Sequence, residues 1–141
     1  EDLLTEKSRY LFTIELNNTV EHAIAILAEN DIGALPVCDA TGRMVGIMSE
    51  RDIVRSFNKT EDTWRQLKVS NIMKKKVISA APGDNVRDVI AVMNEKRIRH
   101  VPVLEDSELV AMFSVRDLFS YLLKATQAQR DTMTMAYEML R

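Results

Sequence analysis

An internal duplication constrains the fold of this chain more than any other feature of its sequence. Residues 66 positions apart match up to the turn near Thr41, and residues 65 positions apart match after it. The matched pairs include Val20/Val86, Ile24/Ile90, Ala25/Ala91, Ile32/Ile98, Pro36/Pro102, Val37/Val103, Val45/Val110, Ser49/Ser114, Arg51/Arg116 and Asp52/Asp117. Two copies are too few for a solenoid, so we predict a pseudo-twofold pair in which each unit buries its apolar face against the other.

Hydrophobic periodicity predicts the same order of elements in each unit. Apolar residues at three- and four-residue spacing predict helices that begin near Val20 and Val86, after polar residues that can cap them. Paired apolar runs predict two hairpins, Leu35–Cys38 with Met44–Met48 and Val101–Leu104 with Leu109–Phe113. Second helices follow Ser49 and Ser114, and leading strands are expected at Leu11–Ile14 and Val77–Ser79.

The predicted fold class is therefore α/β (α+β), with two β-α-β-β-α units forming one compact module. A proline in the first strand of each hairpin removes a ladder donor, so that strand should be an edge strand or be bulged there. We place the first unit with its lead and linker at residues 1–68, the second unit at 69–124, and a C-terminal helix extension at 125–141. The last helix of the second unit is expected to continue into that extension, with an apolar stripe at Leu118, Leu122, Ala125, Met133, Ala136 and Leu140. The stripe predicts a homodimer, with folding back onto its own module as the alternative.

Composition excludes several classes of protein. The formal net charge of −2 lacks the positive field that sequence-independent nucleic-acid binding requires. One cysteine, Cys38, rules out an internal disulfide framework and fits a cytoplasmic location. No apolar run approaches the length of a membrane span, so we expect no direct membrane contact. The chain opens with Glu1-Asp2 and no initiator methionine, so we interpret it as trimmed or excerpted.

A Ser-x-x-Asp pattern stands at the start of the second helix of each unit, as Ser49/Asp52 and Ser114/Asp117. The free amides and positive dipole end there favour an anion, and the carboxylate could accept hydrogen bonds from ribose hydroxyls. The same spacing is also close to a capping box, in which the serine and the acid satisfy the helix end themselves. The two interpretations are compatible, and both stay open.

Basic side chains suited to phosphate lie near these positions. Arg51 and Arg116 precede the two aspartates, and Arg99-His100 precede the second Pro-Val strand. Each arginine is either a phosphate contact or a solvated surface charge. His100 is either a satisfied core histidine or a ligand contact, and Lys74–Lys76 is either a solvated turn or an anion contact. Because Arg99 and His100 belong to the second unit, we expect Asp117→Asn to weaken binding of phosphate-rich ligands more than Asp52→Asn. Gly46 should let a ligand approach the backbone of the first unit.

Catalysis finds little support in the sequence. His22 has no cysteine or second histidine at ligand spacing, so we expect no metal. The two serines have no distinct base assigned to them, and Cys38 in an apolar strand reads as a core residue. We predict that the chain is not an enzyme.

These motifs together resemble the tandem cystathionine β-synthase (CBS) domain pair. The resemblance rests on Ile32–Val37 and Gly46–Asp52 in the first unit and on Ile98–Val103 and Ala111–Asp117 in the second, with Ala111 replacing the usual glycine. It implies a regulatory module that binds AMP or ATP, or alternatively NAD(H) or S-adenosylmethionine, in clefts between the units. The rival is a ligand-free dimerisation scaffold.

The resemblance implies that Thr13 and Ser79 lie where backbone or side-chain groups contact an edge of the adenine. It also implies that the apolar walls around the adenine are formed by Ile14, Ile32, Ile98 and Val101. The full set of candidate ligand-binding residues is Thr13, Ile14, Ile32, Ala34, Pro36, Ser49, Arg51, Asp52, Ser79, Ile98, Arg99, His100, Val101, Pro102, Ser114, Arg116 and Asp117.

Overall fold

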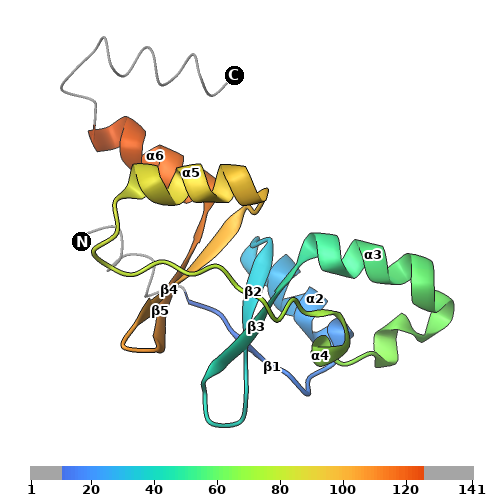
Figure 1. Cartoon of the computed structure of the whole chain (residues 1–141). Helices are drawn as coiled ribbons and strands as arrows, with labels where there is room; N and C mark the ends of the chain where they lie inside the picture. Colours follow the sequence, from blue (N-terminus) through green and yellow to red (C-terminus); the bar gives the residue numbers. More distant parts are fainter. Residues whose placement is uncertain (1–10, 126–141) are drawn as a thin grey trace.

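The computed structural model describes residues 11–125, apart from the side chains of residues 58–62, as two similar units (Figure 1). The first unit contains β1 (Ile14–Glu15), α2 (Val20–Asn30), β2 (Ala34–Cys38), β3 (Met44–Ser49) and α3 (Glu50–Thr60). A 3-10 helix (Glu61–Gln66) and the short α4 (Val69–Ile72) connect it to the second unit. The second unit contains α5 (Val86–Lys96), β4 (His100–Glu105), β5 (Glu108–Ser114) and α6 (Val115–Ala125). Each unit has its own apolar core.

The first helices of the two units, α2 and α5, have the same kinds of cap at their starts and ends. The Thr19 hydroxyl accepts a hydrogen bond from the backbone N–H of His22 at 3.1 Å, and the Asn85 side chain accepts one from that of Arg87 at 2.8 Å. Both helices end in a residue with left-handed backbone, Asp31 (φ 52°) and Arg97 (φ 57°). The predicted helix starts are therefore confirmed.

The duplication extends to individual backbone pairs. Ile14 pairs in parallel with Val37 in the first unit, and Ala80 pairs in parallel with Val103 in the second. Both predicted hairpins form, β2 with β3 and β4 with β5, and each has a register shift at equivalent places, Val37/Cys38 and Val103/Leu104. The predicted duplication thus holds at the level of single backbone pairs. The expectation that each unit buries its apolar face against the other was wrong, because the buried residues form a separate core in each unit.

The leading strands are shorter than predicted and begin later. β1 is limited to Ile14–Glu15 where Leu11–Ile14 was expected, and Val77–Ser79 forms no strand. In the second unit the N–H of Ala80 donates to the carbonyl of Pro102 at 2.9 Å, and the N–H of Leu104 donates to the carbonyl of Ala80 at 2.9 Å. The next parallel pair back along the chain would need an N–H from Pro102, which proline lacks.

The same limit applies to Pro36 in the first unit, where pairing begins at Ile14 opposite Val37. The expectation that the proline strand lies at the edge was wrong for β2, which is the central strand of the order β1-β2-β3. Pro36 is tolerated there because it precedes the residues that pair with β1. The bulge expected at the proline lies one residue beyond it, at Val37/Cys38.

The linker before the second unit is fastened to the first. Ile47 of β3 and Lys74 exchange backbone hydrogen bonds of 3.0 and 2.8 Å, and Val69 of α4 is fully buried in the core of the first unit. A methyl group at Gly46 would lie 2.8 Å from both the Lys74 carbonyl oxygen and the Met73 sulfur. The interpretation of Gly46 as room for a ligand was therefore wrong, because the linker occupies that space.

The boundaries after residues 68 and 124 stay predictions, and Met133, Ala136 and Leu140 lie outside the described residues. Between residues 11 and 125, no helix combines the length and apolar character needed to cross a membrane.

We predict that Gly46→Ala lowers the free energy of unfolding by about 1–3 kcal/mol, because the added carbon pushes the linker off β3. Gly83→Ala is the matched control, since a methyl group there meets nothing within 4 Å, and it should change stability by less than about 0.5 kcal/mol. Urea denaturation of both variants measures the difference. Equal stabilities would contradict the close packing of the linker on Gly46.

Candidate functional site

Two clefts lie between the units, and each is lined by residues of both. The Asp52 cleft has a volume of about 240 Å³ and is lined by Gly33, Ala34, Ile47, Ser49, Glu50, Arg51, Asp52, Lys74, Arg97, Ile98, Arg99 and His100. The Asp117 cleft has a volume of about 300 Å³ and is lined by Phe12, Asp31, Ile32, Gly33, Ala34, His100, Met112, Ser114, Arg116 and Asp117. Each cleft therefore combines the Ser-x-x-Asp element of one unit with the helix-to-strand loop of the other.

The Asp52 carboxylate acts as a helix cap. Its Oδ2 accepts hydrogen bonds from the Ser49 backbone N–H at 2.9 Å and the Ser49 hydroxyl at 3.0 Å. The Ser49 hydroxyl in turn accepts one from the Asp52 backbone N–H at 3.3 Å. Oδ1 lies 3.9 Å from the Lys74 ammonium, and the residue is only 7% exposed. The capping interpretation is correct for this aspartate, and it leaves Oδ1 directed at a flexible lysine.

Asp117 has the same arrangement at the start of α6. Its Oδ2 accepts a hydrogen bond from the Ser114 N–H at 2.8 Å, and the Ser114 hydroxyl accepts one from the Asp117 N–H at 3.1 Å. The duplicated motif thus builds the same local geometry twice, with one carboxylate oxygen holding the helix start.

His100 lies where the two clefts meet. It is half-buried, lines both clefts, and belongs to β4. A methyl group at Gly33 of the first unit would lie 3.3 Å from the Cε1 and Nε2 atoms of the His100 ring. The Gly33–His100 contact therefore forms a wall shared by the clefts, which the sequence interpretations of His100 did not include.

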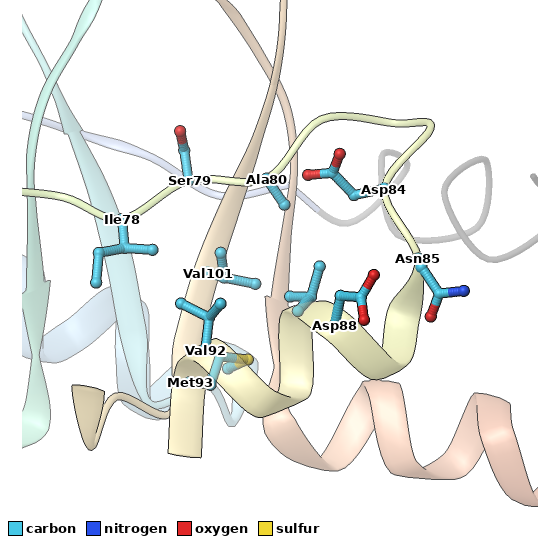
Figure 2. Close-up of a pocket in the computed structure, with 10 residues that line it drawn as sticks. Ile78, Ser79, Ala80, Asp84, Asn85, Asp88, Val92, Met93 and Val101 are labelled. Atoms are coloured by element: carbon cyan, nitrogen blue, oxygen red, sulfur yellow. The ribbon is translucent and has the colours of Figure 1, made fainter. Parts of the chain in front are cut away.

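The remaining predicted site residues divide among several places. Ile98 and Ile32 line the Asp52 and Asp117 clefts respectively, as expected for apolar walls, and Ala34 lines both. Ser79 and Val101 instead line a separate pocket of about 170 Å³ beside α5 (Figure 2). The other four do not line either cleft: Thr13 is exposed, and Ile14, Pro36 and Pro102 are buried.

Sequence reasoning missed several lining residues, including Phe12, Asp31, Glu50, Arg97 and Met112. The signal for Asp31 and Arg97 was available, because both end the first helix of their unit just before the Pro-Val strand. Lys74 lines the Asp52 cleft, which favours the interpretation of Lys74 as an anion contact over that of a solvated turn.

The assignment of Arg99 to the cleft of its own unit was wrong. Arg99 lines the Asp52 cleft together with Arg97, and His100 lines both clefts. Each cleft contains the helix-to-strand loop of the other unit, so the basic loop of the second unit lines the same cleft as the aspartate of the first. The expected order of effects for Asp117→Asn and Asp52→Asn is therefore reversed.

Cys38 is buried at the end of β2. Burial, and secondarily the negative charge of Asp39, raise the pKa of its thiol, so the thiol is protonated at neutral pH and is a poor nucleophile. No group of three metal-ligating His, Cys, Asp or Glu side chains occurs among the residues described. The absence of a metal, the absence of catalysis and the cytoplasmic location all stay predictions.

Comparison with known proteins matches this architecture to one family. The family model described as "CBS domain" matches residues 2–59 and 69–124. An uncharacterised 33.4 kDa protein of Thermofilum pendens is 33% identical over 113 residues, which are 80% of this chain and 36% of that protein. The chain thus spans about a third of that relative.

Solved structures give the same result. The CBS-domain protein ATU1752 of Agrobacterium tumefaciens superposes with a TM-score of 0.80 at 32% identity, covering 85% of this chain and 95% of that one. The CBS domain pair of protein MJ0100, solved with 5′-methylthioadenosine and S-adenosyl-L-methionine, gives a TM-score of 0.72 at 28% identity over 82% and 90% of the two chains. The chain therefore belongs to the CBS-domain family, with two CBS units that form a pair.

Proposed function

We propose that the chain is a regulatory module that binds an adenosine nucleotide or another adenosyl compound between its two CBS units. The observation that carries this proposal is the pair of inter-unit clefts, each with a capped Ser-x-x-Asp helix start facing a loop of the other unit. AMP and ATP are the first candidates, with NAD(H) and S-adenosylmethionine as alternatives. The module is not an enzyme in this proposal and uses no metal.

The cleft walls suit the parts of such a ligand. The starts of α3 and α6, each an 11-residue helix, offer a positive dipole end to a phosphate. Arg51 and Arg116 stand beside them and can pair with phosphate oxygens. Ile98 and Ile32 provide apolar surface for a base, and the second oxygen of each capping aspartate can accept a hydrogen bond from a ribose hydroxyl.

The ligands in the MJ0100 structure support the adenosyl class, since both are adenosyl compounds in a CBS pair similar to this one. Regulation requires that the ligand bind two arrangements of the units, or of two copies, with unequal affinity. The competing proposal is a scaffold whose clefts stay empty and whose helices mediate assembly. The partners we propose are a small molecule and a second copy of the chain, with no role for nucleic acid or membrane.

We expect thermal denaturation to separate these two functions. A ligand present at a hundredfold its dissociation constant should add about 2.7 kcal/mol to the free energy of unfolding. AMP, ATP, NAD⁺ and S-adenosylmethionine are tested in parallel, with ribose 5-phosphate as the control without a base. A stabilisation by none of the adenosyl compounds would favour the scaffold and reject ligand sensing.

The capping aspartates provide a residue-level test. We expect Asp52→Asn to weaken adenosine nucleotide binding by roughly 10- to 100-fold, because a charge-assisted bond to ribose is lost. Stability should fall by about 1 kcal/mol or less, since asparagine also caps helices. Asp106→Asn in the β4–β5 turn is the control, because it replaces an exposed aspartate outside both clefts. Calorimetric titration that finds unchanged affinity in Asp52→Asn, Asp117→Asn and the double variant would leave both residues as helix caps only.

We also propose that the module forms a homodimer through its helices. The most exposed large apolar side chains are Val54 (63%) and Phe57 (42%) on α3, Val92 (39%) on α5 and Tyr121 (36%) on α6, among the residues whose side chains are described. These side chains lie on three helices, and closed twofold dimers are the commonest assembly of protein chains, which supports the proposal.

Val54→Asp should weaken this dimer without unfolding the chain, because it puts a charge on an exposed apolar position. Analytical ultracentrifugation should show a shift from dimer toward the 16.1 kDa monomer, while the control Lys75→Asp on the exposed linker leaves the dimer intact. A wild-type chain that sediments as a monomer at tens of micromolar would overturn the dimer.

A further inference from the structure

We propose that the two clefts bind adenosyl ligands of different charge. This proposal rests on the proposed function. The Asp52 cleft takes the ligand with a polyphosphate, such as a nucleoside triphosphate. The Asp117 cleft takes an adenosyl ligand that carries no phosphate or carries a positive charge. The repeat relates the lining residues of the two clefts position by position, and several related positions differ in charge.

The residue that ends the first helix of each unit has opposite charge in the two copies. Arg97 ends α5 and lines the Asp52 cleft, whereas its repeat counterpart Asp31 ends α2 and lines the Asp117 cleft. Both have the same left-handed backbone, with φ of 57° and 52°. The two side chains therefore leave equivalent points of the backbone at the mouths of equivalent clefts.

The next residues of the same loop increase the difference in charge between the two clefts. Arg99 and His100 of the second unit correspond to Gly33 and Ala34 of the first, so the loop that serves the Asp117 cleft has no cation at either place. Lys74 adds a further cation to the Asp52 cleft, 3.9 Å from the carboxylate of Asp52.

The described side chains give the clefts opposite charge balance. Four cations, Arg51, Lys74, Arg97 and Arg99, face two carboxylates in the Asp52 cleft. One cation, Arg116, faces the carboxylates of Asp31 and Asp117 in the other. All of these cations are exposed, so each contributes a modest, salt-screened attraction, and only their sum discriminates between ligands.

A polyphosphate has several negative charges that four clustered guanidinium and ammonium groups can share, so its affinity for the Asp52 cleft should depend steeply on salt. The same group in the Asp117 cleft would face the two carboxylates of Asp31 and Asp117, with Arg116 as the one lining cation to balance them. An uncharged thioether nucleoside or a sulfonium carries no such penalty, and a sulfonium is attracted by the two carboxylates.

The test exchanges the two helix-end charges, as Arg97→Asp and Asp31→Arg. Each position already holds a left-handed non-glycine residue, so neither exchange should alter the fold, and urea denaturation checks this. ATP, adenosine and S-adenosylmethionine are titrated calorimetrically into the full chain at about 50 mM and about 500 mM salt, which lie on either side of the roughly 0.1 M at which the Debye length is about 10 Å. Lys76→Asp, an exposed cation outside both clefts, is the control.

We expect Arg97→Asp to weaken ATP binding about tenfold at low salt while adenosine affinity changes less than about threefold. Asp31→Arg should strengthen ATP binding at a second site and weaken S-adenosylmethionine binding. Asp52→Asn should impair ATP more than Asp117→Asn does, and the order should reverse for S-adenosylmethionine.

Two kinds of failure are distinguishable. If none of the three compounds binds the wild-type chain, the proposed function fails. If they bind, but the ratio of ATP to adenosine affinity is the same in wild type, Arg97→Asp and Asp31→Arg, the charge division is overturned while ligand binding stands. Loss of ATP binding in Asp117→Asn with full binding in Asp52→Asn would likewise overturn the assignment of the clefts.

Discussion

The backbone pairing of the linker with β3 is the contact on which both clefts depend. Lys74 and Ile47 exchange two hydrogen bonds, and a glycine at position 46 leaves room for the Lys74 carbonyl oxygen and the Met73 side chain. This pairing sets where the second unit starts relative to the first, and it brings the Lys74 side chain to Asp52. The position of the second unit then places Arg97, Arg99 and His100 in one cleft with the Ser-x-x-Asp element of the first.

The capping aspartates show why a structural and a binding interpretation of one motif need not compete. A helix start has free N–H groups that must be satisfied, and Ser49 with Asp52 satisfies them through one carboxylate oxygen. The hydrogen bonds fix the orientation of the Asp52 carboxylate, and its other oxygen lies 3.9 Å from the ammonium of Lys74, which also lines the cleft. Asp117 repeats the arrangement. Capping therefore prepares a rigid acceptor of the kind that binding a ribose would require.

The sequence predicted the helices and hairpins within each unit better than it predicted which residues of the two units meet in the clefts. Helix starts at Thr19 and Asn85 and both hairpins followed from local periodicity and capping chemistry. The short leading strands did not, because the effect of Pro102 on a parallel neighbour is a non-local consequence of its missing N–H. The place of Arg99 in the cleft of the other unit was also beyond sequence reasoning, since spacing within a repeat says nothing about which loops a pseudo-twofold axis exchanges.

The shared wall of the clefts supplies a route by which they could influence each other. Ala34 and His100 line both clefts, and the His100 ring packs so closely on Gly33 that a methyl group there would lie 3.3 Å from its Cε1 and Nε2 atoms. A ligand that displaces this wall in one cleft changes the shape of the other, and thermodynamic linkage makes any such effect on affinity reciprocal. Duplication thus produces two sites with the same capped carboxylate, while the divergence of Arg97 from Asp31 makes them chemically unequal. Under the proposed function, two unequal sites that share one wall give a response that depends on the ratio of two ligands instead of the amount of one.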